Sequence, residues 1–226
     1  FGLSPEDKTV PSLPDASPGI WHLAHPTWFF ETFVLSRLRP SRSSPHPAYG
    51  VLFNSYYQTV GPQWARASRG VLSRPTVAEV TAWRVAVTEA LAEAIRTVDE
   101  AGWAQIAPVL EVGLNHEEQH QELFCTDLRH ALSLNPLAPQ AFPVAASPSA
   151  RTDLAPLRFV DGPEGVVEIG ARPEAGFAFD NERPRHRALL QPHMLADRLV
   201  TNGEFLSFNQ DRGYRTASLW LAEGWD

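Results

Sequence analysis

The sequence contains 226 residues, of which 43% are hydrophobic and 20% charged, with seven Trp among them. This composition excludes a wholly disordered chain and allows one large domain or two of ordinary size. Nineteen basic against 26 acidic residues give a formal net charge of −7, which argues against nucleic acid as a partner.

The chain is expected to begin with two helices joined by a loop. Ser17 and Pro18 resemble an N-cap followed by a first-turn proline, and an apolar stretch rich in Trp and Phe continues from them to Leu38. This pattern predicts a first helix over that stretch. Residues 48–60 are expected to form a second, shorter helix.

Two further helices are predicted before the chain changes character. Thr76 opens a Thr-Val-Ala-Glu capping box, and the Ala-rich segment after it predicts a helix that ends near Asp99. Residues 103–132 are expected to form the fourth helix. Four helices with modest connections indicate an antiparallel four-helix bundle over residues 1–135.

The second half of the sequence has a different composition and period. Residues 136–156 are rich in proline and nearly free of charge, which is typical of an extended linker. Short apolar runs broken by Gly and Pro over 157–169 and 186–199 predict strands, and a capping box at Thr201 predicts a short helix. Residues 157–226 therefore indicate the first part of an α+β domain that looks truncated.

The cysteine count and the hydropathy pattern restrict the class of protein further. Cys125 stands alone, which excludes a disulfide framework and a multi-cysteine zinc site, and we expect it to be a small buried hydrophobic residue. No apolar run reaches the length of a membrane span, and no signal peptide is recognisable. Because the first residue is Phe1, part of the natural N-terminus is expected to be missing. We expect a cytoplasmic protein without a membrane partner.

The predicted fourth helix carries the motif His-Glu-Glu-Gln-His at residues 116–120. Because positions four apart lie on one face of a helix, His116 and His120 are expected to point the same way, towards the bundle interior, whereas Glu118 points away. The same face is expected to contain Val109, Val112, Leu123 and Asp127. Two histidines on an inner face can satisfy their ring nitrogens by holding a metal ion.

A third metal ligand is expected from the first helix, which contains His22 and His25. The stripe formed by Trp21, His25 and Trp28 favours His25 as the inward-facing ring, with His22 displaced to its side. Pro26 complicates this prediction, because a proline inside a helix removes one backbone hydrogen bond. Either the helix kinks there or it begins later in the sequence.

Two other interpretations of these histidines stay open. Each can be an ordinary hydrogen-bonded residue, and this is what we expect of His46, His130, His186 and His193. The letters of the motif also satisfy H-E-x-x-H, the helix signature of zinc peptidases, in which Glu117 would be the general base. Thr126 occupies the position where the elongated peptidase motif has its third histidine, which makes this alternative the weaker one.

Four motifs in order resemble a known family: PDASPGIWHLAHPTWFFETFVL, LFNSYYQTVGP, NHEEQHQEL and FDNERPRH…LADRLVTNGEFLSF. The chain is similar to the ergothioneine-biosynthesis sulfoxide synthases over nearly its whole length. The resemblance implies a DinB-like four-helix bundle followed by a formylglycine-generating-enzyme-like (C-type-lectin-like) domain. In the family the second domain continues well beyond the length seen here, so we expect residues 1–226 to be a portion of a longer protein.

The resemblance also implies a cofactor and a reaction. In the family three histidines hold a non-haem Fe(2+), and they match His25, His116 and His120 of this sequence. The enzyme joins C2 of hercynine to the sulfur of a cysteine-type thiol, either cysteine or γ-glutamylcysteine, and O2 supplies the sulfoxide oxygen. Pro26 departs from the family pattern, which commonly has Thr after the first ligand.

Five further residues match functional positions of the family. Gln119 matches a residue that helps to position hercynine. Arg66 and Arg69 match a paired-arginine motif that binds carboxylates of the thiol substrate, a task that suits the guanidinium fork. Tyr56 and Tyr57 match tyrosines near the iron in one branch of the family, where a hydroxyl can donate a proton or a hydrogen bond.

Three alternatives to this function stay open at the level of the sequence. Ovothiol-type and selenoneine-type synthases share the ligand pattern. A non-catalytic or thiol-handling DinB-like module would hold its metal as a structural ion or as a transferase cofactor. A H-E-x-x-H zinc peptidase is the remaining and least favoured alternative.

Overall fold

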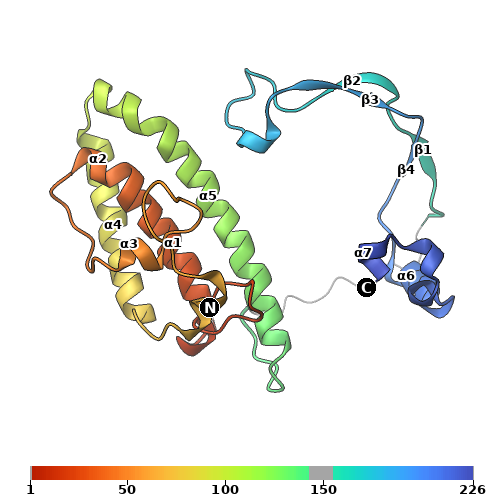
Figure 1. Ribbon diagram of the computed structural model, residues 1–226, viewed down its shortest axis with the longest axis horizontal. Coiled ribbons are helices and arrows are strands. Elements are labelled where there is room, and N and C mark those ends of the chain that lie inside the picture. The colour runs from red at the N-terminus through yellow and green to blue at the C-terminus, as the bar shows by residue number, and fades with distance from the viewer. Residues whose placement is uncertain (1, 143–154, 226) are drawn as a thin grey trace. The chain divides into compact units, whose positions relative to one another are not determined.

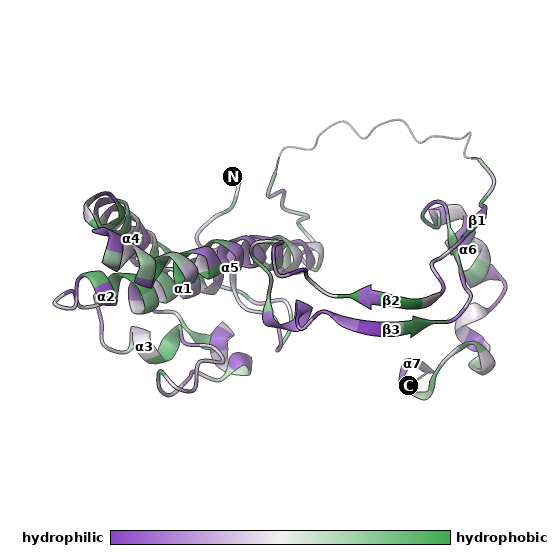
Figure 2. Ribbon diagram, turned by 90° about the horizontal axis from the view of Figure 1, so that it is seen from above, coloured by the Kyte–Doolittle hydropathy of each residue, from purple (hydrophilic) through white to green (hydrophobic). Residues whose placement is uncertain are grey.

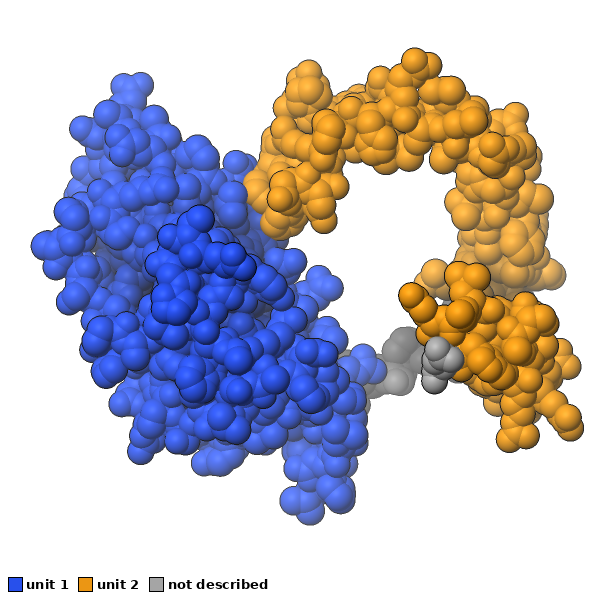
Figure 3. Space-filling model, viewed as in Figure 1, with its two compact units in different colours: residues 1–147 blue, residues 148–226 orange. Residues whose placement is uncertain are grey.

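The structure is a computed structural model that describes residues 2–142 and 155–225. The chain divides into two compact units, residues 1–147 and 148–226 (Figure 3). Long helices make up the first unit, and short strands and helices make up the second (Figure 1). The described residues therefore contain both α and β structure. The predicted linker over 136–156 lies partly outside them.

Three long helices dominate the first unit. Its elements, in chain order, are η1 (Glu6–Lys8), α1 (Gly19–Phe30), the π-helical turn η2 (Glu31–Leu35), α2 (Ser36–Leu38), α3 (Tyr49–Leu52), η3 (Arg66–Val71), α4 (Val77–Thr97) and α5 (Glu100–Ser133). Helix α1 packs against both α4 and α5. The core between them is aromatic and aliphatic, with Trp28, Leu35, Val80 and Ile106 at most 2% exposed.

Side-chain caps fix the beginnings of α4 and α5. The predicted capping box at Thr76 is confirmed: its hydroxyl accepts from the Glu79 amide at 3.2 Å, and the Glu79 carboxylate accepts from the Thr76 amide at 2.6 Å. Asp99 caps α5 by accepting from the Gly102 amide at 2.8 Å. Because Asp99 satisfies this amide, α5 begins three residues earlier than predicted.

Helix α1 differs from its prediction at its start and contains its proline without ending. Pro18, not Ser17, occupies the N-cap position, because the Ser17 hydroxyl accepts a hydrogen bond from Arg69 instead. Helix α1 runs through Pro26 to Phe30 and continues into the π-helical turn. His25 therefore lies on the buried face of a helix that continues through Pro26, so neither a kink nor a later start is required to explain its position.

The second predicted helix is much shorter than expected. Only Tyr49–Leu52 is helical, and the chain then turns, with Tyr56 at a positive φ of 63°. The buried Asn54 side chain holds this turn by donating to the carbonyls of Tyr57 and Gly61 at 3.2 and 3.1 Å. Those side-chain hydrogen bonds compete with helix formation. The described unit thus has three long helices and a one-turn helix where three long helices and a shorter helix over 48–60 were expected.

Helix α5 presents a different face to the core from the one predicted. Val112 and Leu123, expected inside, are each 40% exposed, whereas Gly113 and Leu128 are buried. The buried face is rotated by about 60° at 100° per residue. Figure 2 shows hydrophobic and hydrophilic residues interleaved along α5. Because of this interleaving, the hydrophobic periodicity predicts the direction of the buried face of α5 only approximately. The prediction of a buried Cys125 is also wrong, because this thiol is exposed.

The second unit contains two antiparallel strand pairs and short helices. Strand β1 (Phe159–Asp161) pairs with β4 (Met194–Ala196), and β2 (Gly165–Ile169) pairs with β3 (His186–Leu190). The remaining elements are η4 (Asp180–Glu182), α6 (Asn202–Gln210), η5 (Gly213–Arg215), η6 (Ala217–Leu219) and α7 (Ala222–Trp225).

The predicted strands and the predicted capping box at Thr201 are confirmed in this unit. Gly213 alone is buried among its described residues, and large apolar side chains such as Leu199 and Leu221 are 89% and 87% exposed. The described part of this unit therefore has no hydrophobic core of its own. Among the helices described in either unit, none combines the length and apolar composition needed to cross a bilayer.

Candidate metal centre

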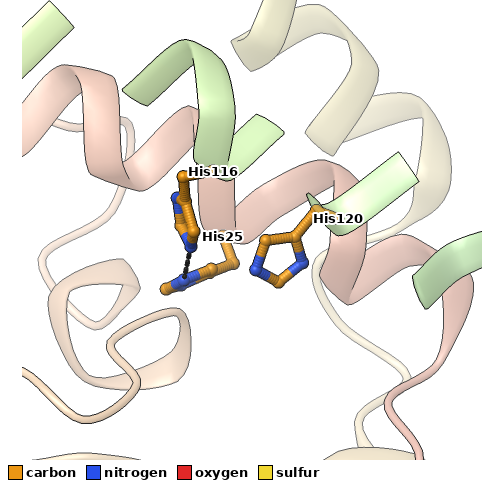
Figure 4. A group of neighbouring side chains, drawn as sticks. All are labelled: His25, His116 and His120. Carbon is orange, nitrogen blue, oxygen red and sulfur yellow. Dashed lines mark hydrogen bonds between the residues drawn. The ribbon is translucent and has the colours of Figure 1, made fainter. Parts of the chain in front are cut away.

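Three imidazole rings from two helices converge inside the first unit. His25 comes from α1, and His116 and His120 come from α5 (Figure 4). The ring centroids are 4.6 to 4.9 Å apart. One nitrogen of each ring lies within 4.8 Å of the other two, a group of atoms that can hold a metal ion. The structure thus brings together the three histidines that the sequence singled out.

Two of these rings use Nδ1 for a hydrogen bond outside the group, and His25 and His116 are hydrogen-bonded to each other through Nε2 (Figure 4). The Nδ1–H of His25 donates to the carbonyl of Phe53 at 2.6 Å, and its Nε2 lies 3.2 Å from Nε2 of His116. His120 uses Nδ1 for a 3.0 Å hydrogen bond with His22. Nδ1 of His116 has no hydrogen-bond partner among the described residues. All three rings can therefore offer Nε2 once an ion replaces the hydrogen bond between His25 and His116.

The spacing of these atoms is compatible with a metal ion. A metal–nitrogen bond of about 2.1 Å places neighbouring ligand nitrogens about 3.0–3.4 Å apart in octahedral or tetrahedral geometry. The Nε2 atoms of His25 and His116 already have this separation, at 3.2 Å. The other separations within the group are at most 4.8 Å, so an ion would draw these nitrogens together by about 1.4 Å or less. The residues present therefore fit a mononuclear metal site.

Burial keeps the three rings uncharged. Removal from water, together with the neighbouring imidazoles, lowers the pKa of His25 to about 3 and that of His120 to about 2. Burial also lowers the pKa of His116. Because a metal binds the neutral imidazole, the folded chain holds its candidate ligands in the binding form at neutral pH.

Tryptophan side chains fix the plane of the His25 ring. Trp21 stacks on it, with ring centroids 4.4 Å apart and 10° between the planes, and Trp28 stacks at 5.6 Å and 19°. Both indoles are buried. Their positions four before and three after His25 put them on its side of α1. The stripe of residues that made His25 a ligand candidate thus also contains the two tryptophans that pack on its ring.

A buried arginine lies one aromatic ring away from His25. The Cζ of Arg69 is 3.6 Å from the centroid of Trp21, and its terminal nitrogens donate to the hydroxyls of Ser17 and Ser55 at 2.9 and 3.0 Å. Its side chain forms no ion pair with any described residue, and its buried Nε has no partner among them. Burial lowers the pKa of Arg69 to about 10, which leaves it positively charged at neutral pH.

The other predicted site residues lie at different distances from the histidines. Tyr57 packs near them, with ring centroids 6.4 Å from His25, and burial raises its pKa. Tyr56 is 76% exposed and lies under Arg66, which is itself exposed. Gln119 is exposed on α5. The described residues thus gather Tyr57 and Arg69 around the histidines but leave Tyr56, Arg66 and Gln119 on the surface.

The hydrogen bonds of two residues beside the cluster were not predicted. His22 was set aside as a ligand, yet it is only 6% exposed and its Nε2 lies 3.1 Å from the carboxylate of Asp127. Asp127 follows His120 by seven residues, two helical turns along the same face of α5. This spacing was the available signal, but an acid seven residues from a histidine is too common to identify a pair.

Comparison with known proteins places these features in context. The chain is 29% identical over 214 residues to a hercynine oxygenase of Mycolicibacterium thermoresistibile and 28% identical over 213 residues to a hercynine oxygenase of Mycobacterium tuberculosis. Each similarity covers 94% of this chain but only 45% and 47% of the respective relative. The chain thus spans about half the length of the curated relatives it matches. No protein-family model matches the chain.

Proposed function

We propose that this chain carries the metal site of an iron(II)-dependent, O2-using sulfoxide synthase. The reaction would join C2 of hercynine to the sulfur of cysteine or γ-glutamylcysteine. The observation that carries the proposal is the convergence of three neutral imidazoles, each able to direct one nitrogen to a common point, in a chain similar to two hercynine oxygenases. The DinB-like character of the first unit and the formylglycine-generating-enzyme-like character of the second belong to the same proposal.

The ligand set suits the chemistry that this reaction needs. Iron oxygenases commonly use two histidines and one carboxylate, whereas three neutral histidines add no negative charge. Iron(II) held by His25, His116 and His120 would keep its double positive charge and open coordination positions, and would supply binding of thiolate and activation of O2. The protein's part is to hold the three rings neutral and oriented, through burial, the Phe53 carbonyl and the Trp21 stack.

Arg69 is the proposed binding site for a carboxylate of the thiol substrate. A buried guanidinium without an acidic partner carries a positive charge that no negative charge compensates. A carboxylate can compensate it and form two parallel hydrogen bonds with it. Its Nε is a donor without a partner among the described residues. Arg66, which is exposed nearby, would contact a second carboxylate or the same one from the solvent side.

Tyr57 and Gln119 have proposed roles on the other substrates. Because burial raises the pKa of Tyr57, its hydroxyl stays protonated at neutral pH and can donate a hydrogen bond or a proton near the metal. Gln119 precedes the ligand His120 and would contact hercynine from the exposed side of α5. Tyr56 would take part only if its exposed loop moved, so we place it second to Tyr57.

The alternatives are separated by residues outside the ligand set. A zinc peptidase would use Glu117 as general base beside the metal, but this carboxylate forms an ion pair with Arg84 at 2.6 Å. That pairing disfavours a base role. Ovothiol-type and selenoneine-type synthases would use the same three ligands and differ in the imidazole substrate or the chalcogen donor. A non-catalytic module would bind metal without consuming O2.

The proposal is tested on the whole protein, prepared without oxygen and loaded with iron(II). Consumption of O2 that requires both hercynine and a thiol, with formation of a C–S bond seen by mass spectrometry, would support it. Single His25→Ala, His116→Ala and His120→Ala variants should lose bound iron, while His130→Ala, an exposed residue of α5, should keep it. Stoichiometric iron in His25→Ala would overturn the ligand assignment. O2 consumption with histidine in place of hercynine would favour the ovothiol-type alternative.

A further inference from the structure

A chain of hydrogen bonds, buried at its first step and partly buried at its carboxylate end, runs from His120 away from the other two ligands. Nδ1 of His120 lies 3.0 Å from Nδ1 of His22, and Nε2 of His22 lies 3.1 Å from Oδ2 of Asp127. The same oxygen accepts from the backbone amide of Ser17 at 3.3 Å. The chain joins α1 to α5, because His22 lies on the first helix and the other two side chains on the second.

Proton positions along this chain follow from its carboxylate end. An ionised carboxylate only accepts hydrogen bonds, so Nε2 of His22 must carry the hydrogen that it shares with Asp127. A neutral imidazole has one N–H, so Nδ1 of His22 must then be an acceptor. The hydrogen between the two imidazoles therefore belongs to Nδ1 of His120. This leaves the lone pair of His120 on Nε2, the atom that a metal would need.

The opposite assignment is inconsistent at both ends. If Nδ1 of His22 donated, its bare Nε2 would face the carboxylate of Asp127 at 3.1 Å, with lone pairs on both atoms. Nδ1 of His120 would then accept, and its hydrogen would sit on Nε2. An Nε2–H group cannot bind a metal, so that arrangement would remove one ligand from the group.

The three candidate ligands are thus oriented in different ways. His25 donates to a backbone carbonyl, and His116 has no partner for Nδ1 among the described residues. His120 alone of the three is oriented by a side chain that is itself oriented by another. A metal-bound histidine commonly donates its second N–H to such an acceptor, and loss of the acceptor weakens the metal site.

We propose that His22 is a positioning residue for the metal ligand His120, and that Asp127 selects the tautomer in which His22 can act as acceptor. The proposal rests on the metal site proposed above. His22 does not bind the ion. It holds the ring of His120 at the angle that directs Nε2 to the metal, and it ties this angle to the packing of α1 on α5.

The test compares two substitutions of equal shape, His22→Asn and His22→Leu. Asn places Oδ1 where Nδ1 of His22 stands, so it can accept from His120, whereas Leu cannot. Asn and Leu have the same branching and the same number of side-chain heavy atoms, so both variants remove the same ring atoms. Titration of the full chain with Co2+ without oxygen, followed by visible absorption, measures metal affinity independently of turnover. Circular dichroism establishes that both variants are folded.

We expect His22→Leu to bind Co2+ about 10- to 100-fold more weakly than the parent, and His22→Asn to stay within a few-fold of the parent. His130→Leu, at an exposed position of α5, is the matched control and should bind as the parent does. Equal affinities of the Leu and Asn variants would overturn the positioning role while leaving the metal site intact. A parent chain that binds no Co2+ would overturn the metal site and the positioning role with it.

A second measurement tests the tautomers directly. Long-range proton–nitrogen correlation spectra of the Zn2+-loaded chain distinguish Nδ1–H from Nε2–H imidazoles. We expect His120 to be protonated on Nδ1 and His22 on Nε2. An Nδ1–H tautomer of His22 would contradict the proposal. In Asp127→Leu, which removes the selecting carboxylate, we expect a mixture of His22 tautomers and a weaker Co2+ affinity; an unchanged Nε2–H tautomer would contradict the role of Asp127.

Discussion

The indole of Trp21 stacks on the imidazole of His25, with ring centroids 4.4 Å apart and planes within 10° of parallel. The same indole lies 3.6 Å from the Cζ of Arg69. One buried aromatic ring therefore contacts both a candidate metal ligand and the buried cation proposed to bind substrate. A change at Trp21 should accordingly affect the fold and both halves of the site.

Replacing Trp21 by Leu should destabilise the first unit. Trp21 is 3% exposed, and truncating a buried aromatic side chain leaves a cavity that costs about 2–4 kcal/mol in the free energy of unfolding. Urea denaturation followed by circular dichroism measures this loss. Trp103→Leu is the control, because Trp103 is 42% exposed on α5 and its replacement should change stability by less than about 0.5 kcal/mol. Equal losses in both variants would contradict the packing described here.

Removing the guanidinium of Arg69 should act on the thiol substrate. We expect Arg69→Met to lower kcat/KM for the thiol at least about tenfold, since a buried charged hydrogen-bond partner of a substrate contributes about 2–5 kcal/mol. The KM for hercynine should change little. Arg129→Met, at an exposed position of α5, should leave both parameters unchanged. Steady-state kinetics of the whole protein, with each substrate varied in turn, provide the measurement. An unchanged KM for the thiol in Arg69→Met would exclude the proposed contact.

The metal-free chain should lose stability as the pH falls below about 6.5. Folding lowers the pKa of His25 to about 3 and that of His120 to about 2, mainly because burial removes them from water. Between their unfolded pKa of about 6.5 and these folded values, the unfolded chain binds protons that the folded chain does not. The stability is therefore fully present above pH 6.5 and is lost progressively below it.

Between pH 7.5 and pH 5.5, each of these two rings should lower the free energy of unfolding by about 1.4 kcal/mol. Urea midpoints across this range give the slope. The slope of the free energy of unfolding against pH gives the number of protons taken up on unfolding. His25→Asn should lower this number by about one, and His130→Asn, at an exposed position, should leave it unchanged. A stability that is flat from pH 7.5 to 5.5 would show that these rings are not buried as described.

The capping box of α4 offers a test of local structure. Thr76→Ala removes the hydroxyl that accepts from the Glu79 amide, and we expect a loss of about 0.5–2 kcal/mol in the free energy of unfolding. Thr81→Ala, in the exposed middle of the same helix, serves as the comparison and should lie within about 0.5 kcal/mol of the parent. The prediction fails if the two variants lose equal stability.

Helix starts with a local chemical cause were predictable from the sequence. The boxes at Thr76 and Thr201 need only residues three positions apart, and both form as expected. The segment 48–60 was not predictable in the same way. Its helical pattern is overridden by the hydrogen bonds that Asn54 makes to carbonyls up to eight residues ahead, and nothing in a short window indicates such bonds.

The convergence of the three candidate ligands was predictable from the sequence, but the residues that support them were not. The spacing of His116 and His120 fixes their common direction, because helix geometry alone determines it. The role of His22 depends on how α1 is placed on α5, and that placement follows from packing across the core. Polar and apolar residues are mixed on the face of α5, so the burial of Val112 and Leu123 was wrongly predicted. The predicted common direction of His116 and His120 is confirmed.

The absence of a partner for Nδ1 of His116 among the described residues has a kinetic consequence. The rings of His25 and His120 are each held by a hydrogen bond through Nδ1. The described hydrogen bond of the His116 ring instead joins its Nε2 to Nε2 of His25, two atoms that would bind the ion. An ion should therefore bind in two stages: His25 and His120 coordinate it first, and the His116 ring then rotates to coordinate it. Release should follow the reverse order.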